Sequence, residues 1–137
     1  MLFHSDLGVV LKKIPSGEKN EVVILLTKDH GKMAFMSYGG RDPKSRKSGS
    51  VQLFNTLDFL ARGSSGHLPA IKEVSVIASR AGRILKQDSK LNAYFRACEI
   101  VKLMDELTKE LQGGGKGFDD LEAVLDHVDA PGITLLF

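Results

Sequence analysis

The stretch that decides the fold is EVVILLTKDHGKMAFMSY, residues 21–38. Its first seven residues form a β-branched apolar run that is long enough for one strand and too short for a typical helix. Asp, His and Gly then mark a turn, and the following KMAFMSY alternates, which sends Phe35 to one side and Met36 and Tyr38 to the other. We predict two strands joined by a short turn, with Phe35 assigned to the core. Tyr38 is the better candidate for exposure, and the sequence leaves its orientation open.

Similar patterns flank this stretch on both sides. GVVLKKI, residues 8–14, alternates loosely and ends at a Pro-Ser-Gly turn. VQLFNTLDFLA, residues 51–61, has one more apolar face, and a Gly- and Ser-rich hairpin signal separates it from LPAIKEVSVIA, residues 68–78. Five short strands without crossover helices predict an antiparallel sheet, which at this length commonly closes into a small barrel.

From Ser79 onward the apolar residues follow the spacing of helices. An amphipathic helix of about 20 residues is predicted, with a stripe formed by Leu91, Tyr94, Phe95, Cys98, Val101, Met104, Leu107 and Leu111. GGGKGF, residues 113–118, then predicts a linker between helices because glycine disfavours helical backbone.

A second helix is expected to begin near Asp119 and to end before Pro131. Its stripe is formed by Leu121, Val124, Leu125 and Val128. The predicted fold class is therefore α+β. A five-stranded antiparallel β-barrel over residues 1–78 is followed by a partial α-helical bundle over residues 79–137.

Composition favours a folded, soluble protein. Of the 137 residues, 42% are apolar and 26% are charged, and no window approaches the roughly 18 uninterrupted apolar residues of a membrane helix. No secretory signal is visible at the N-terminus, so we expect a cytoplasmic location. The single cysteine, Cys98, permits neither an intrachain disulfide nor a cysteine-based zinc site, and its place on an apolar stripe indicates a core thiol.

The net charge of +2 conceals an asymmetry along the chain. Residues 1–96 hold 16 Lys and Arg against 8 Asp and Glu, whereas residues 97–137 hold 3 against 9. The front of the chain is therefore expected to carry an electropositive face, which bears on its partners rather than on its fold. The sequence leaves open whether basic residues between Arg80 and Lys90 extend that face.

The basic residues concentrate in YGGRDPKSRKSGSVQLF, residues 38–54. This loop places four cations within seven positions, namely Arg41, Lys44, Arg46 and Lys47. One interpretation is a surface loop that is cationic by chance. The other is a nucleic-acid interface, because cations beside aromatic faces are the combination that single-strand binders use. Phe35 and Phe54 are assigned to the core, which leaves Tyr38 as the aromatic residue expected to face solvent.

Enzymatic signatures are weak throughout the chain. GGGKGF lacks the preceding strand, the glycine four residues ahead of Gly-Lys and the following Ser or Thr of a phosphate-binding loop. The four histidines are scattered without metal-ligand spacing, and the GSSGH stretch, residues 63–67, lacks the G-x-S-x-G elbow of hydrolases. We therefore predict a protein without catalytic residues, metal or cofactor.

The order of these features resembles a known family. A β-branched strand, a turn ending in HGK, a strand running to a double glycine, a basic loop containing KS and a Gly-rich hairpin succeed one another between residues 8 and 77. This series is similar to the N-terminal OB domain of the RecO family of bacterial recombination mediators. The helices that follow resemble the start of that family's helical domain.

The resemblance implies an OB-type barrel in a non-enzymatic DNA repair protein associated with the bacterial nucleoid. Members bind single- and double-stranded DNA, anneal complementary strands, and act with RecR and the single-strand-binding protein in RecA loading. Lys32 matches the family's HGK turn, and Arg41, Lys44 and Arg46 match its basic loop. With the charged neighbours and the exposed aromatic, the candidate DNA-binding residues are Lys32, Tyr38, Arg41, Lys44, Arg46, Lys47 and Arg62.

Two departures from the family pattern matter. Many relatives carry further basic residues on the strand before the double glycine, where this chain has Ala34, Met36 and Tyr38, so stacking by Tyr38 is the substitute hypothesis. Full-length relatives continue through a longer helical domain, often with a cysteine-ligated zinc module, so this chain is expected to be either a fragment or a short relative. The alternative function is a protein-interaction or oligomerisation module, in which the barrel or the helical face ending in ITLLF docks RecR or another copy.

Overall fold

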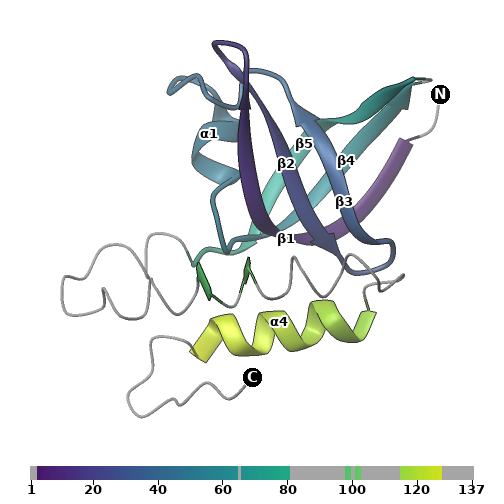
Figure 1. Cartoon of the computed structure of the whole chain (residues 1–137), viewed down its shortest axis with the longest axis vertical. Helices are drawn as coiled ribbons and strands as arrows, with labels where there is room; N and C mark the ends of the chain where they lie inside the picture. The colour runs from purple at the N-terminus through teal and green to yellow at the C-terminus, as the bar shows by residue number, and fades with distance from the viewer. Residues whose placement is uncertain (1–2, 65, 81–97, 100, 103–114, 128–137) are drawn as a thin grey trace.

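The computed structural model describes residues 3–64, 66–80, 98–99, 101–102 and 115–127. Five strands close into a barrel, and one longer helix crosses its lower end (Figure 1). The elements are β1 (Phe3–Ser16), β2 (Asn20–Thr27), β3 (Gly31–Ser37), α1 (Arg46–Ser50), β4 (Thr56–Ser64), β5 (His67–Ala78) and α4 (Gly115–His127). This arrangement confirms the predicted barrel followed by a helical part.

The strands neighbour one another in the order β1-β2-β3-β5-β4 around the barrel. Strand β1 pairs antiparallel with both β2 and β4, and the β2–β3 and β4–β5 pairs are antiparallel as well. Because of these strand directions, β3 and β5 run parallel to each other. The barrel therefore closes through one parallel pair, in which Met36 lies opposite Ala70, and the predicted antiparallel pairing describes its other neighbours.

Side chains alternate between the barrel interior and its outer surface. The interior cluster consists of Val10, Val23, Leu25, Phe35, Val51, Leu57, Phe59, Ala61 and Ile71. The rings of Phe35 and Phe59 meet edge to face at a centroid distance of 4.9 Å, a favourable aromatic geometry. Phe35 is fully buried and Tyr38 is 54% exposed, which confirms both sequence predictions.

A second apolar cluster lies between the outer barrel surface and the helical part. Phe118, Leu121 and Leu125 of α4 pack with a group contributed by the barrel and a short helical segment, namely Val9, Leu11, Leu26, Phe54 and Val101. Helix α4 begins at Gly115, so the prediction that residues 113–118 form a linker is wrong for its last four residues. Burial of Phe118 to 1% exposure outweighs the low helix propensity of the glycines beside it.

Arg80 joins α4 to the barrel, and its side chain is almost completely buried. Its Nε donates to Asp126 Oδ1 at 2.7 Å and its Nη2 donates to Glu122 Oε2 at 3.2 Å. Its Nη1 donates to the Phe54 carbonyl at 2.9 Å and to Thr56 Oγ1 at 2.6 Å. Arg80 therefore does not extend the basic face, and the residues from 81 to 90 lie outside the described part of the chain.

The segment before β4 differs from the sequence prediction. The strand expected over residues 51–61 begins only at Thr56, and the basic loop contains the short helix α1. Ser45 caps this helix by accepting a hydrogen bond from the Lys47 N–H at 3.2 Å. Phe54 has a φ of 76°, and its carbonyl is one of the Arg80 acceptors. A contact from a distant part of the chain thus accompanies a backbone conformation that apolar alternation cannot predict.

The first predicted helix falls largely outside the described residues. Cys98–Glu99 and Val101–Lys102 are helical, and the other positions of its stripe are not described. Among the described residues, no helix combines the length and the apolar character needed to cross a membrane.

Candidate nucleic-acid interface

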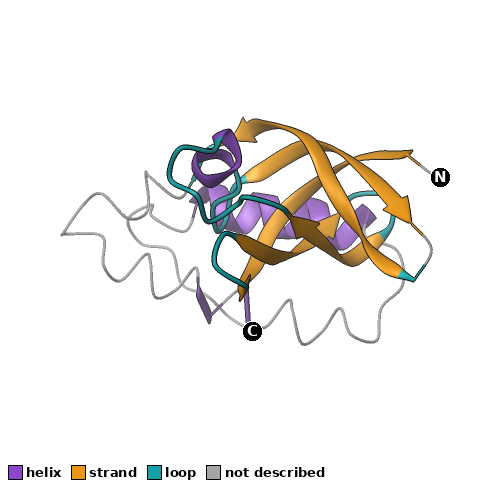
Figure 2. Cartoon of the chain, turned by 90° about the horizontal axis from the view of Figure 1, so that it is seen from above, coloured by secondary structure: helices purple, strands orange, loops and turns teal. Residues whose placement is uncertain are grey.

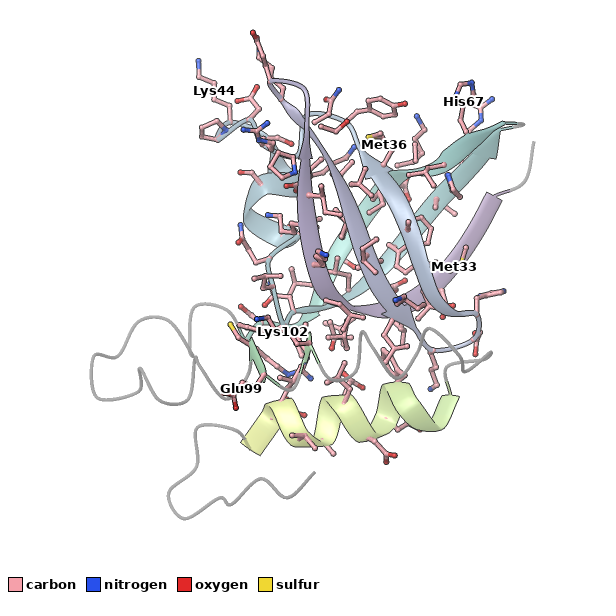
Figure 3. The ribbon with its side chains drawn as sticks, in the orientation of Figure 1. Met33, Met36, Lys44, His67, Glu99 and Lys102 are labelled. Carbon is pink, nitrogen blue, oxygen red and sulfur yellow. The ribbon has the colours of Figure 1, made fainter. Side chains whose placement is uncertain are left out.

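The part of the basic loop that carries the cations, residues 41–47, lies at the end of the barrel away from α4, whereas Phe54 at the end of the loop packs with α4. Figure 1 shows α1 beside the upper part of the barrel and α4 below it, and the view from above in Figure 2 places α4 behind the strands. Among the labelled side chains of Figure 3, Lys44 stands at the upper end and Lys102 lies beside α4. Helix α4 therefore does not cover the cations of the basic loop.

The start of the loop is fixed to the β1–β2 turn by hydrogen bonds. The Gly39 N–H donates to Asn20 Oδ1 at 2.9 Å, and the Arg41 N–H donates to the Lys19 carbonyl at 2.9 Å. The Arg41 Nη1 also donates to the Gly17 carbonyl. Arg41 is exposed and its guanidinium carries five N–H donors, so it braces the loop and still presents charge to solvent.

The double glycine makes this docking sterically feasible. Gly39 has a φ of 73°, a conformation that side chains disfavour. A Cβ added to Gly40 would lie 2.7 Å from Ser37 Oγ and 2.8 Å from Glu21 Oε1, two buried polar atoms. Glu21 Oε1 is also 3.5 Å from Lys13 Nζ. The close packing of Gly40 against Ser37 and Glu21 is thus consistent with a defined path for the chain from β3 into the basic loop.

Tyr38 and Lys47 lie together at the centre of this surface. The Lys47 Nζ donates to the Tyr38 carbonyl at 3.2 Å, so the ammonium group sits beside the residue with the most exposed aromatic ring of the loop. Burial, and secondarily the positive charge of Lys72, lowers the pKa of Lys47 below its ordinary value. A partly desolvated cation beside an exposed tyrosine can offer a phosphate contact and a stacking surface together.

The remaining loop cations occupy neighbouring positions. Lys44 is exposed, and its main-chain N–H donates to Asp42 Oδ1 at 3.0 Å, which fixes the turn that precedes α1. Arg46 is the first residue of α1, and its side chain is outside the description. Arg41, Lys44, Arg46 and Lys47 therefore belong to one continuous segment that includes Tyr38.

Lys32 lies apart from this segment. It is opposite Leu26 near the beginning of β3, and Tyr38 follows six positions later, a distance of about 20 Å along an extended chain. The adjacent turn is held by buried Asp6, whose Oδ2 lies 2.8 Å from His30 Nδ1. The structure thus places Lys32 at the other end of β3 from the loop.

Arg62 joins the surface from another strand. It lies opposite Ala70 in the β4–β5 pair, and Ala70 lies opposite Met36 in the β3–β5 pair. Directly opposed residues share one face of a sheet, so Arg62, Ala70 and Met36 form a row across three strands. This row links β4 to the part of β3 that leads into Tyr38.

Sequence reasoning missed Lys72, which the structure adds to this surface. Lys72 is exposed on β5 and near enough to Lys47 to influence its pKa. Within the described ranges, no group of three or more His, Cys, Asp or Glu side chains is arranged to hold a metal ion. The surface described here is therefore a set of cations around an aromatic side chain.

Comparison with known proteins agrees with this architecture. The family described as "Recombination protein O N terminal" matches residues 1–80. A protein named DNA repair protein RecO from Bacillus pumilus (strain SAFR-032) is 34% identical over 129 residues, which cover 94% of this chain and 48% of that protein. The protein of the same name from Bacillus subtilis (strain 168) is 37% identical over 103 residues, 75% of this chain and 38% of that protein.

A third relative extends the similarity over nearly the whole chain. The DNA repair protein RecO of Bacillus cytotoxicus is 29% identical over 140 residues, covering 99% of this chain and 54% of that protein. The chain spans about half the length of the curated relatives that it matches. With its five-stranded barrel and the family match over residues 1–80, this chain belongs to the recombination protein O family.

Proposed function

We propose that this chain binds single- and double-stranded DNA without sequence specificity and serves DNA repair and homologous recombination by annealing strands. The observation that carries the proposal is the grouping of cations around exposed Tyr38 at the barrel end away from α4. Small barrels of the OB type present such a face and its loops to oligonucleotides. The proposed DNA-binding barrel comprises residues 1–78, and residues 79–137 begin a helical domain.

Each part of the surface has a distinct role in this proposal. Arg41, Lys44, Arg46 and Lys47 neutralise phosphates, Arg62 extends the contacts across the barrel, and Lys32 supplies a contact at the far end of β3. Tyr38 stacks on a base, which favours single strands because their bases are accessible. Phosphate contacts are independent of sequence, and so is the binding we propose.

Annealing follows from charge neutralisation. Two strands repel each other through their phosphates, and a protein that neutralises phosphates on one or both lowers that repulsion. No bond is made or broken by the protein, so the proposal requires neither a catalytic residue nor a cofactor. Family membership further motivates action with RecR and the single-strand-binding protein in RecA loading, in the cytoplasm at the nucleoid.

The salt dependence of single-strand binding tests this proposal. The variant changes Arg41, Lys44, Arg46 and Lys47 together to Glu, and binding to a fluorescent oligothymidylate is measured at several salt concentrations. Each lost phosphate contact is expected to reduce the slope of log K against log salt by about 0.7. Equal affinities and equal slopes for the wild type and the variant would contradict the assignment.

Two controls separate charge from folding. Because Arg41 and Lys47 also make hydrogen bonds within the protein, the single substitution Lys44→Glu tests charge at an exposed position whose hydrogen bond to Asp42 uses only its main chain. Lys102→Glu makes the same charge change beside α4. We expect Lys44→Glu to weaken binding at low salt and Lys102→Glu to leave it nearly unchanged.

Docking of a partner protein is the second candidate function. It is favoured by a groove of about 280 Å³ between β1 and the helical segment near Val101. Apolar side chains and three lysines line it, namely Leu11, Lys12, Lys13, Leu53, Phe54, Cys98, Val101 and Lys102. RecR or a second copy of the chain would occupy it. Sedimentation distinguishes the candidates, because a strict monomer that binds DNA tightly disfavours docking of a second copy.

A further inference from the structure

A β-bulge in β5 places Lys72 on the outer surface of the barrel. In the β4–β5 pair, Ala61 lies opposite Ile71 and Leu60 lies opposite Glu73, so Lys72 between them has no opposing residue. Ile71 is buried in the interior and Val74 packs against it, whereas Lys72 and Glu73 are both exposed. Bulges re-aim side chains and are frequent beside functional sites. The irregularity thus presents Lys72 outward without moving Ile71 from the core.

The parallel pairing of β3 with β5 brings Lys72 to the basic loop. Met36 lies opposite Ala70. Two residues further along the chain come Tyr38, which directly follows the end of β3, and Lys72 of β5. The Lys47 Nζ is 3.2 Å from the Tyr38 carbonyl, and the charge of Lys72 contributes to the lowered pKa of Lys47. Strand pairing and the hydrogen bond therefore place Lys47, Lys72 and Tyr38 together, and the influence of Lys72 on the pKa of Lys47 agrees with that placement.

The positive charge of Lys72 acts unfavourably on Lys47, and no carboxylate of the described residues forms an ion pair with either lysine. Neither source of the Lys47 pKa shift is an acidic group. Like charges held close together destabilise the unliganded protein. A bound anion would remove this cost, so the pair is arranged to favour an anionic ligand.

We propose that Lys47 and Lys72 hold one phosphate of the DNA backbone between them, and that the strand crosses the parallel β3–β5 junction toward Arg62 on β4. This inference rests on the proposed DNA-binding function and adds a path for the strand. The path runs across three strands through the row of Met36, Ala70 and Arg62. It makes Lys72 a phosphate ligand and leaves Lys32 at the periphery.

Substitution of Lys72 tests the path. We compare Lys72→Ala with the wild type and with Lys102→Ala, which removes the same charge from an exposed lysine beside α4. One lost phosphate contact should lower the affinity for an oligothymidylate about fivefold at 0.1 M salt and reduce the salt slope by about 0.7. Lys102→Ala should change neither quantity.

A double substitution sharpens the test. If Lys47 and Lys72 hold the same phosphate, Lys47→Ala and Lys72→Ala together should weaken binding by less than the product of their separate effects. Inorganic phosphate, titrated alone in a chloride buffer, separates the sources of the anion. Binding of single-stranded DNA to both lysines at concentrations at which inorganic phosphate does not bind them supports a DNA site.

The outcomes are distinguishable from failure of the proposed function. If the charge-reversed basic loop loses DNA binding and Lys72→Ala binds as tightly as Lys102→Ala, the path is overturned and the proposed function stands. If the wild-type chain does not bind DNA, both are overturned. Because Lys72 is exposed and its charge opposes that of Lys47, its removal should not lower the thermal unfolding midpoint, and that measurement confirms that affinity is being compared between folded proteins.

Discussion

The two ends of the barrel use positive charge in opposite ways. Beside α4, buried Arg80 is surrounded by the carboxylates of Glu122 and Asp126 and by acceptors of the β4 segment. At the other end, Lys47 and Lys72 lie together, and the described carboxylates pair with neither. The environment, rather than the residue type, therefore separates a cation with a structural role from one that is available to an anionic ligand.

Arg41 stands between these two cases. Its main chain and one guanidinium nitrogen bond to carbonyl groups of the β1–β2 turn, yet the residue is exposed. Arg41 therefore orders the basic loop and adds to its positive electrostatic potential. This dual use explains why a loop rich in cations, which would otherwise repel each other, has a defined conformation.

The largest expected effect is at the α4 end. Arg80→Ala removes the hydrogen bonds that connect Asp126, Glu122 and the Phe54 carbonyl. We expect a loss of about 3 kcal/mol in the free energy of unfolding, at the low end for buried pairs because Asp126 is half exposed. Urea unfolding measures the loss. Arg41→Ala is the matched control, and equal unfolding free energies for both variants would erase the distinction between the two ends.

The next effect concerns the docking of the basic loop. Gly40→Ala forces a Cβ against Ser37 Oγ and Glu21 Oε1, and overpacking of this kind costs about 1–3 kcal/mol. We expect reduced stability by thermal unfolding together with weaker DNA binding, because the loop is displaced. Gly49→Ala is the control, since nothing lies within 4 Å of its added Cβ. A neutral Gly40→Ala variant would show that the close approach does not position the loop.

A smaller effect is expected for base stacking. Tyr38→Ala should weaken single-strand binding by about 1 kcal/mol, the low end for stacking on one base, and should affect duplex binding less. The sequence contains two tyrosines and no tryptophan, so Tyr94→Phe leaves Tyr38 as the sole tyrosine emitter. Quenching of its fluorescence by oligothymidylate reports the contact. Unchanged fluorescence at saturating DNA would remove Tyr38 from the interface.

The smallest effect is a pH dependence. The pKa of Lys47 is lowered from 10.5 by burial and then by Lys72, so Lys47 loses its charge at a lower pH than an ordinary lysine. DNA affinity should therefore begin to fall below pH 10.5, and Lys72→Ala should move that fall toward higher pH. Binding measured across the alkaline range in both proteins checks the direction. A shift toward lower pH in the variant would contradict the pairing of these lysines.

Folding stability has a corresponding sign at Lys47. Because its pKa is lower in the folded state, the unfolded chain binds more protons between the lowered pKa and 10.5. The contribution of Lys47 to stability therefore rises as the pH increases through that window. Lys47 donates to the Tyr38 carbonyl although burial and the charge of Lys72 disfavour its charged form. DNA binding would relieve this electrostatic cost.

Local pattern predicted the barrel well. Alternation in β3 placed Phe35 inside and Tyr38 outside, and both assignments are confirmed. These predictions succeed because a strand with a two-residue period exposes one face to the core regardless of distant residues. The helix stripe of Leu121 and Leu125 is buried for the corresponding reason.

The features that escaped prediction depend on contacts distant in sequence. The role of Arg80 requires partners on α4 more than 40 residues away, and the same side chain donates to the carbonyl of Phe54, whose φ is positive. The exposure of Lys72 beside the basic loop requires the bulge against β4 and the pairing of β5 with β3. Glycines in GGGKGF suggested a linker, but burial of Phe118 decided otherwise.

A backbone amide NMR titration of the chain with oligothymidylate locates the DNA on the barrel. We expect the largest chemical-shift changes at Tyr38, Lys47 and Lys72, and little change at Val101, Lys102 and the residues of α4. Salt should reverse the changes at the basic loop. Largest changes at Val101, Lys102 and α4, with the basic loop unaffected, would contradict the assignment of DNA to this end of the barrel.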